Sequence, residues 1–288
     1  MSNNRRRNSW RRQQVHRQLV LLGIVVILIV SVLVCWNIRR NRKEVSAKVS
    51  KIEQRDETKK VVDKTESIDT GVQRIERVKK EAKSKGYPAN VIELLDKNEE
   101  TLDFVENYEE KKDMPSADTI GEDLAEGQIP KLYQWDERWG YAEYGTSIVA
   151  VSGCGPTCMA MVAAGLTNDA SITPAKVAAY GTEHQYIDEN NDTYWRFMNE
   201  AGANWNLSCY DGQLTEDQVS AELNAGHPII CSVGPGDFTQ NGHFIVLTGY
   251  EDGSVTVNDP FSRKNSSQLW VYAEIADQIK AMWVYSLK

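Results

Sequence analysis

Cysteine and histidine are scarce in this chain, with five and four among its 288 residues. No Cys and His pairs occur at the spacing of a zinc finger, so this class of metal site is excluded. The cysteines also give no disulfide framework. Cys35 lies in an apolar run and Cys154 in a motif of its own, which leaves an odd set. The fold must therefore depend on an apolar core, for which the composition provides ample residues.

Acidic residues are absent from residues 1–43, which carry ten Lys or Arg. The rest of the chain holds 23 basic and 41 acidic residues, a net charge of −18. A body this acidic is not expected to bind nucleic acid, so nucleic acid is excluded as a partner.

One long apolar run follows the basic arm. From Leu19 to Trp36 there is no charged residue, and this length can cross a bilayer as a helix. Arginines lie on both sides of this run, so the positive-inside rule hardly distinguishes the two orientations of the helix. A short Arg-rich tail is hard to translocate, which favours a cytoplasmic N-terminus. We expect residues 1–18 to be a cytoplasmic tail and residues 19–38 a transmembrane helix. No small-x-small cleavage site follows, so we expect the chain to stay anchored in the cell membrane, single-pass, with the remainder extracytoplasmic.

Two helical regions are predicted after this span. Residues 39–84 are highly charged with a narrow apolar stripe at three-four spacing, which indicates a helical stalk. The stripe also allows a coiled-coil dimer, although a single spacer helix is favoured. Residues 85–127 are predicted to be an accessory helix, beginning near Ala89, and a linker. The accessory helix has an apolar face, so we expect it to dock on the domain that follows.

The most informative motif is Ser152–Thr157, where Cys154 opens a predicted helix. Pro156 suits the first turn of a helix, and Gly165 predicts its end. A thiol at the positive end of a helix macrodipole is favoured as thiolate, which is a nucleophile. Flanking glycines leave the sulfur uncovered. Cys154 is therefore a candidate nucleophile, the alternative being a buried structural cysteine; Cys158, one turn later, is expected in the core.

A hairpin provides a candidate base. Residues 242–250 form a predicted strand that starts with His243, and residues 254–260 form the returning strand. Histidine can take the thiol proton, and a carboxylate or amide on its far nitrogen fixes the ring. A three-residue loop at the turn puts Asp259 on the face of His243, whereas a two-residue turn puts Asn258 there. We favour Asp259.

Residues 188–192 alternate acidic side chains, as calcium loops do. The stretch lacks the glycine at the sixth position and the glutamate at the twelfth that such a loop requires. We therefore predict a solvated loop, and we expect no metal and no cofactor.

Four motifs occur in a fixed order along the chain. Together they resemble the papain-fold cysteine peptidases related to the bacteriocin-processing, double-glycine-leader peptidases. The motifs lie at residues 134–140, 152–157, 242–250 and 258–260.

The resemblance covers residues 128–288, and the stretch from Tyr87 to Lys112 is similar to an accessory segment found before such domains in Gram-positive bacteria. It implies an α+β papain-like domain in which the helix bearing the nucleophile packs on an antiparallel sheet. It also implies that Cys154 is the nucleophile, His243 the base and Asp259 the orienter. Gln134 is the implied oxyanion-hole residue.

These observations predict a membrane-anchored extracytoplasmic cysteine peptidase that hydrolyses peptide bonds through a thioester. Its expected partners are a peptide or protein substrate and the membrane. Two alternatives stay open. One is a peptidoglycan-peptide hydrolase of the same fold, and the other is a catalytically inactive surface binding module.

Overall fold

The computed structural model describes residues 71–288. The predicted tail, the predicted transmembrane helix at 19–38 and most of the predicted stalk lie outside the described residues. The fold reported below is that of the unit Gln73–Lys288. Within residues 71–288, no helix combines the length and the apolar composition that crossing a bilayer requires.

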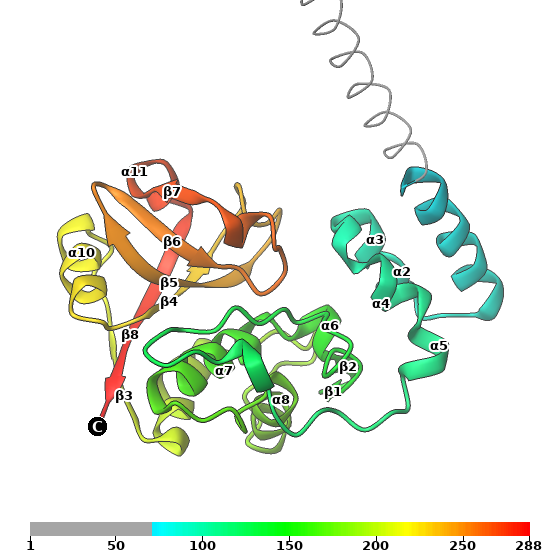
Figure 1. Ribbon diagram of the computed structural model, residues 1–288, viewed down its shortest axis with the longest axis horizontal. Coiled ribbons are helices and arrows are strands. Elements are labelled where there is room, and N and C mark those ends of the chain that lie inside the picture. Colours follow the sequence, from blue (N-terminus) through cyan, green and yellow to red (C-terminus); the bar gives the residue numbers. More distant parts are fainter. Residues whose placement is uncertain (1–70) are drawn as a thin grey trace, which may run out of the picture. The chain divides into compact units, whose positions relative to one another are not determined.

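A six-stranded antiparallel sheet forms the C-terminal half of the fold (Figure 1). Its strand order is β3-β8-β4-β5-β6-β7, and a separate two-stranded ribbon pairs β1 with β2. The strands are β1 Glu143–Tyr144, β2 Ser147–Ile148, β3 Leu207–Asp211, β4 Ile229–Val233, β5 His243–Glu251, β6 Ser254–Asn258, β7 Leu269–Val271 and β8 Ile279–Leu287.

Each face of the sheet packs into its own apolar core, as the period-two alternation of strands requires. On β5, Phe244 and Val246 join one core with helix α7, whereas Ile245 and Leu247 join the other with helix α10. Strand β4 lies in the middle of the sheet and is buried at every position, which explains why all its residues except Ser232 are apolar. The sheet is therefore covered on both faces, and this confirms the predicted α+β class with an antiparallel sheet.

The helices are short except for α7, α8, α10 and the helix of residues 71–85. The numbered helices are α2 Ala89–Ile92, α3 Leu94–Lys97, α4 Leu102–Glu106, α5 Tyr108–Lys111, α6 Val149–Ser152, α7 Cys154–Thr167, α8 Pro174–Glu183, α9 Trp195–Glu200, α10 Glu216–Asn224 and α11 Tyr272–Ile275. Five 3₁₀ turns join them: η1 Glu99–Thr101, η2 Gly121–Asp123, η3 Ala201–Trp205, η4 Asn265–Ser267 and η5 Ala276–Gln278. Residues 71–85 form a further helix.

Helix α7 is the buried helix that the sequence predicts, but its end is not where the glycine indicated. It begins at Cys154 as expected and continues through Gly165 to Thr167, where Asn168 adopts the left-handed conformation (φ 52°). A Cβ at position 165 would lie 2.9 Å from the Gln128 carbonyl oxygen and from the Ile129 Cα. The glycine therefore serves close packing of the incoming chain against the helix rather than helix termination.

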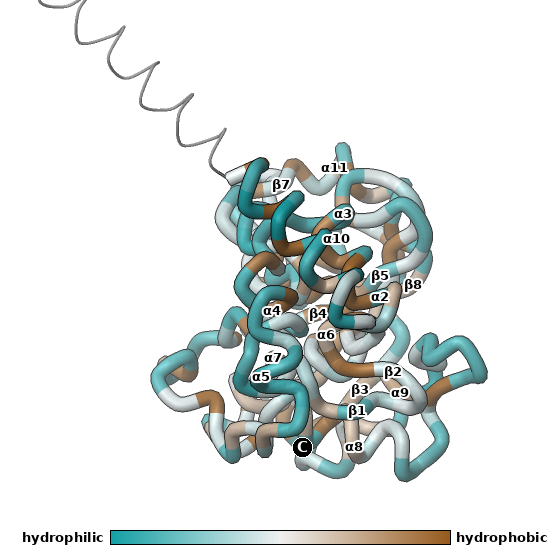
Figure 2. The backbone as a smooth tube through the Cα atoms, turned by 90° about the vertical axis from the view of Figure 1, so that its right-hand side faces the viewer, coloured by the Kyte–Doolittle hydropathy of each residue, from teal (hydrophilic) through white to brown (hydrophobic). Residues whose placement is uncertain are grey.

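The accessory segment consists of residues 71–112 and docks on the domain that follows. Instead of the single helix predicted from Ala89, the structure has the one-turn helices α2 to α5. Their apolar residues share a core with Ala150 of α6, and the Phe104 ring stacks on Tyr141 at 4.1 Å. In Figure 2, α6 is hydrophobic whereas α5 is hydrophilic, as an inner and an outer element should be.

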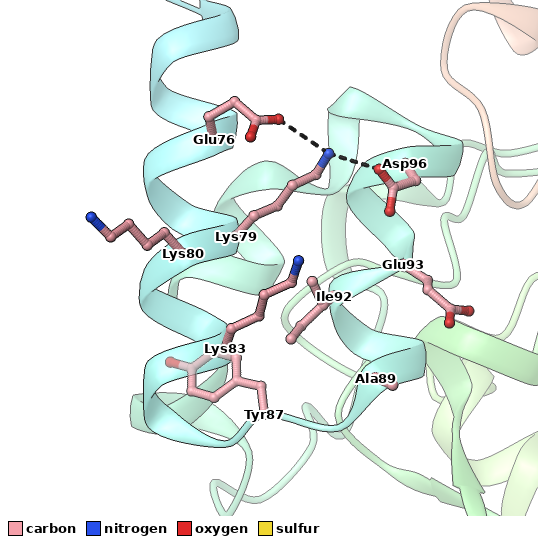
Figure 3. A pocket seen from close by; sticks show the side chains of 9 residues that line it. All are labelled: Glu76, Lys79, Lys80, Lys83, Tyr87, Ala89, Ile92, Glu93 and Asp96. Carbon is pink, nitrogen blue, oxygen red and sulfur yellow. Dashed lines mark hydrogen bonds and ion pairs between the residues drawn. The ribbon is translucent and has the colours of Figure 1, made fainter.

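Ion pairs link the first helix of the accessory segment to the short helices. Lys79 lies between Asp96 at 2.7 Å and Glu76 at 3.4 Å, above a surface cavity of about 760 Å³ (Figure 3). Beneath these charges Val78 and Ala82 are buried. The apolar burial is the larger contribution to docking, because ion pairs at the surface contribute little.

Candidate active site

Cys154 lies at the first position of α7, directly after the single turn α6. Gly153 separates the two helices, with its amide donating to the Val149 carbonyl at 2.8 Å. Within residues 71–288, the Cys154 amide donates to no other backbone group outside its own helix. The thiol is partly exposed, whereas the next ten residues are buried. This is the free-amide helix start that the sequence predicts for a nucleophile.

Gly155 allows the chain to pass close to this helix start. A Cβ at this position would lie 2.6 Å from the Thr193 hydroxyl oxygen. Thr193 is held in place by the Tyr144 hydroxyl at 2.7 Å. The loop that precedes α9 therefore forms one wall beside Cys154, and only a residue without a side chain fits at position 155.

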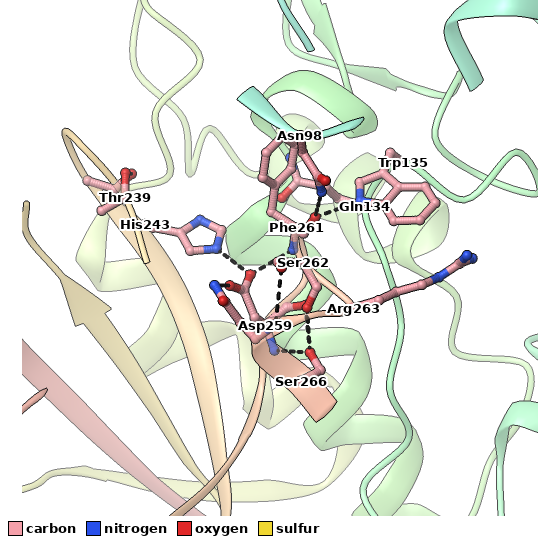
Figure 4. A network of polar contacts seen from close by, with 12 residues as sticks. Asn98, Gln134, Trp135, Thr239, His243, Asp259, Phe261, Ser262, Arg263 and Ser266 are labelled. Atoms are coloured by element: carbon pink, nitrogen blue, oxygen red, sulfur yellow. Dashed lines mark hydrogen bonds and ion pairs between the residues drawn. The ribbon is translucent and has the colours of Figure 1, made fainter. Parts of the chain in front are cut away.

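His243 and Asp259 form a buried pair at one end of the sheet (Figure 4). His243 opens β5, Asp259 directly follows β6, and the imidazole Nε2 donates to the carboxylate Oδ1 at 2.8 Å. Only 9% of His243 and 2% of Asp259 are exposed. Because Nε2 is engaged, Nδ1 is the ring nitrogen left for another partner.

The register of the β5–β6 hairpin differs from the prediction. The expected three-residue loop is wrong: the turn has two residues, Asp252 (φ 47°) and Gly253 (φ 81°), both left-handed, and Glu251 pairs with Ser254. A bulge at Thr248 then shifts the pairing by one residue. The two-residue turn alone would put Asn258 on the face of His243. The bulge shifts the register back by one residue and puts Asp259 there instead.

Beyond the bulge Val246 pairs with Asn258, and the same register continued by one residue puts Asp259 beside Ile245. The Asn258 side chain points away from His243 and donates to the carbonyls of Ile129 and Pro130, both at 3.1 Å. The structure therefore brings Asp259, not Asn258, to the histidine.

Asp259 is saturated with donors. Its Oδ1 also accepts from the Phe261 amide at 2.8 Å, and its Oδ2 accepts from Asn265 Nδ2 at 2.8 Å. The Asp259 amide donates to the Ser266 hydroxyl at 2.9 Å. Burial by itself would raise the pKa of Asp259, but His243 and these donors outweigh it and lower the pKa below the ordinary value. The carboxylate is therefore ionised at neutral pH.

His243 has a strongly shifted pKa. Burial acts to lower it, but the charge of Asp259 and the hydrogen bond to it raise the pKa of His243 to about 10. Cys154 contributes to the same rise of the His243 pKa, both as a hydrogen-bond partner and as a charge. The imidazolium is therefore the favoured form of His243 at neutral pH.

Gln134 bonds to two segments of the site, the one that follows Asp259 and the one that precedes Cys154. Its backbone amide donates to the Pro260 carbonyl at 2.8 Å, directly after Asp259. Its side-chain Nε2 donates to the Ala150 carbonyl at 2.9 Å, in the turn that leads into Cys154. The side chain is only 3% exposed, and its Oε1 has no hydrogen-bond partner among the described residues.

Of the four residues singled out in the sequence, the structure joins His243 to Asp259, and Gln134 bonds both to Pro260, next to Asp259, and to Ala150, in the turn before Cys154. Sequence reasoning missed two that complete the site, Asn265 and Ser266. Their only signal was a short polar stretch after Asp259-Pro260, which is typical of side-chain-to-backbone turns. A cavity of about 330 Å³ adjoins Asp259 and is lined partly by Phe238 and by residues 97–100.

The acidic stretch at 188–192 is a turn with its own hydrogen bonds. Asp188 Oδ1 accepts from the amides of Asn190 and Asp192, both at 2.8 Å. Throughout the described part of the chain, no group of three or more His, Cys, Asp or Glu side chains is arranged to hold a metal ion.

The sequence of this domain matches a known family of peptidases. The model described as the Peptidase_C39 like family matches residues 127–287, which is more than half of the sequence, and the chain belongs to this family. The resemblance inferred from the motifs is thereby confirmed at the level of the family. No curated protein matches the chain.

Two solved structures are similar to parts of the chain. The peptidase domain of Streptococcus ComA, a bi-functional ABC transporter involved in a quorum sensing pathway, is 16% identical, with 47% of this chain and 92% of that one covered and a TM-score of 0.37. A putative C39-like peptidase from Bacillus anthracis is 14% identical, with 56% and 96% covered and a TM-score of 0.35.

Proposed function

We propose that this chain is a cysteine peptidase that hydrolyses peptide bonds through a thioester on Cys154. The observation that carries the proposal is the buried pair of His243 and Asp259 close to a thiol at a helix start. A histidine with a pKa of about 10 remains an imidazolium at neutral pH and stabilises a neighbouring thiolate. Membership of a peptidase family supports this assignment.

The residues divide the reaction into two steps. In the first, the Cys154 thiolate attacks the substrate carbonyl carbon, and the His243 imidazolium gives its Nδ1 proton to the leaving amine as the C–N bond breaks. In the second, water attacks the thioester carbonyl, the imidazole takes a proton from this water, and the thiolate leaves. Asp259 keeps its proton-free carboxylate on Nε2 throughout and so fixes the tautomer of the ring.

Gln134 and the Cys154 amide are the proposed donors to the oxyanion. One hydrogen of Gln134 Nε2 is used by the Ala150 carbonyl, and the second is free to donate. The Cys154 amide, at the start of α7, is the second donor. Both groups are attached to elements that are fixed before substrate arrives, which is what electrostatic stabilisation of a transition state requires.

Hydrolysis of a defined mixture of unstructured peptides, followed by mass spectrometry of new termini, tests the assignment. We expect the full chain to cut, Cys154→Ala to abolish cutting, and Cys209→Ala, the same change at another partly exposed cysteine, to leave it intact. Iodoacetamide should alkylate Cys154 faster than it alkylates the thiol of an unstructured peptide, because the His243 imidazolium stabilises the thiolate. A chain that neither cuts nor reacts faster than a free thiol would be an inactive binding module instead.

The proposal includes a location. The apolar run at 19–38 and its basic flanks support a single-pass protein of the cell membrane with an extracytoplasmic peptidase domain. An extracytoplasmic site has two polymers in reach, secreted peptides and the peptide part of the cell wall. Release of soluble fragments from purified peptidoglycan, with no cutting of linear peptides, would assign the wall as substrate.

A further inference from the structure

A short turn of the accessory segment lies against the loop that holds Asp259. Asn98 caps η1, with its Oδ1 accepting from the Glu100 amide at 3.0 Å. At its other end, the same side chain donates from Nδ2 to the Phe261 carbonyl, 163 residues further along the chain. The Trp135 indole donates to that same carbonyl at 2.7 Å. The Phe261 peptide group is therefore held from two sides.

Glu100 holds the next part of the loop. Its carboxylate accepts from the Arg263 amide at 2.7 Å and from the Lys264 amide at 3.1 Å. These are charge-assisted hydrogen bonds, which are about twice as strong as neutral ones.

The loop that is held in this way is the one that supplies donors to Asp259. The Phe261 amide reaches Oδ1 and Asn265 Nδ2 reaches Oδ2, while Ser266 binds the Asp259 backbone. Glu100 is thus connected to the imidazole by hydrogen bonds that all involve the loop of residues 259–266. Figure 4 shows Asn98 above Phe261 and Asp259 in this network.

We propose that Asn98 and Glu100 are positioning residues for Asp259, so that the accessory segment is a working part of the active site. The proposal rests on the proposed function, because it assigns these residues a role in the same reaction. The packing near Cys154 agrees with this proposal, because the accessory segment shares an apolar core with Ala150, in the turn before Cys154.

A wall of a substrate pocket is the competing role for this segment. Residues 97–100 line the cavity of about 330 Å³ beside Asp259. The two roles differ in kinetics. Loss of a wall weakens substrate binding and raises KM, whereas misplacement of Asp259 lowers kcat and changes the titration of His243.

Two variants of the full chain separate these roles. Glu100→Gln removes the charge and one acceptor from the loop, and Asn98→Ser keeps the cap of η1 but cannot reach Phe261. Glu110→Gln is the matched control in the same accessory segment, because Glu110 of α5 is exposed and its side chain makes no hydrogen bond among the described residues. Thermal unfolding of each variant checks that it is folded.

We expect both variants to lower the pH at which hydrolysis is lost on the alkaline side. A shift of about one pH unit corresponds to roughly tenfold less imidazolium above the pKa, and hence to a roughly tenfold lower kcat there, with KM unchanged. Alkylation of Cys154 by iodoacetamide, measured across the same pH range, should slow in parallel, because less imidazolium is present to stabilise the thiolate. Glu110→Gln should match the wild type in all three measurements.

The outcomes are distinct. A raised KM with no change in either pH profile would assign a wall and overturn the proposal. Variants that match an active wild type in every measurement would overturn it while leaving the proposed function intact. A wild type that does not hydrolyse peptides and whose alkylation is unchanged by His243→Ala would overturn both.

Discussion

At the scale of single residues, the charge of His243 decides how the site responds to pH. Its pKa is raised to about 10, so its contribution to folding is complete below the unfolded value of about 6.5 and is lost as pH rises through 10. Asp259 has a lowered pKa, so its contribution is present above the unfolded value of about 3.9 and is lost as pH falls. The pair therefore stabilises the protein most between these two unfolded values.

Asp259→Asn should uncouple this pair. Without the carboxylate, burial dominates and the pKa of His243 falls, so the alkaline limit of hydrolysis should move to much lower pH and kcat at pH 7 should fall by about 10²–10⁴-fold. In the wild type, the free energy of unfolding should fall as pH rises from 6.5 to 10. In Asp259→Asn, urea titrations over the same range should show most of this fall gone. Asp252→Asn is the same change at an exposed turn residue and should preserve both profiles. An unchanged alkaline limit in Asp259→Asn would contradict the assignment.

Gln134→Ala should separate catalysis from stability. Loss of one oxyanion donor is expected to reduce kcat by about 10²–10³-fold. The free energy of unfolding should fall by only about 1 kcal/mol, because one bond to Ala150 is lost while an unpartnered Oε1 disappears. Progress curves and urea titrations measure the two effects. A stability loss with no loss of kcat would give Gln134 a structural role instead.

The residues of the site were accessible from sequence, but the reason for one of them was not. Cys154, His243 and Gln134 are marked by motifs around each of them. Asp259 depended on a register argument that assumed the wrong turn, and the structure reaches the same residue through a bulge at Thr248. A single sequence does not predict such a bulge, because the bulge arises from contacts between strands.

At the scale of elements, local signals located helix starts better than helix ends. Pro156 and Cys154 correctly indicated the start of α7, since capping and proline effects act within one turn. Gly165 was misinterpreted as a stop because its use is tertiary, the close approach of residues 128–129. The accessory helix was predicted as one element and is four, joined by a 3₁₀ turn capped by Asn98.

Gly165→Ala tests this explanation. A better helix former would gain up to about 1 kcal/mol at an open site, whereas forcing backbone atoms 2.9 Å away to move costs about 1–3 kcal/mol. We expect a net destabilisation of about 1–2 kcal/mol in thermal or urea unfolding. Gly71→Ala makes the same change in a helix with nothing within 4 Å and should not destabilise. A stabilised Gly165→Ala would restore the local interpretation.

At the scale of the whole molecule, the site depends on long-range assembly. The four proposed catalytic residues come from four segments, and the two residues proposed to position them lie more than 160 positions before the loop they hold. Sequence motifs identified the parts of the site, while their meeting could only be inferred through the hairpin. The link from the accessory segment to the loop had no local signature at all.

The proposed location is also a property of the whole chain. In cells that express the full protein, we expect external protease to remove the C-terminal domain, because the proposed topology makes residues 19–38 the membrane anchor and puts the domain outside. A variant lacking residues 19–38 should stay inside and be protected until the cells are permeabilised. Immunoblotting against the C-terminus measures both. Protection of the full protein in intact cells would reverse the topology.

The bulge of the β5–β6 hairpin constrains how its length can vary. The two-residue turn and the extra residue at Thr248 compensate one another, and together they set the partner of His243. Deletion of Thr248 alone would offer the histidine an uncharged amide, Asn258, in place of the carboxylate. Insertions and deletions in this hairpin are thus compatible with an ionised partner only as matched pairs, one in the turn and one in the strand.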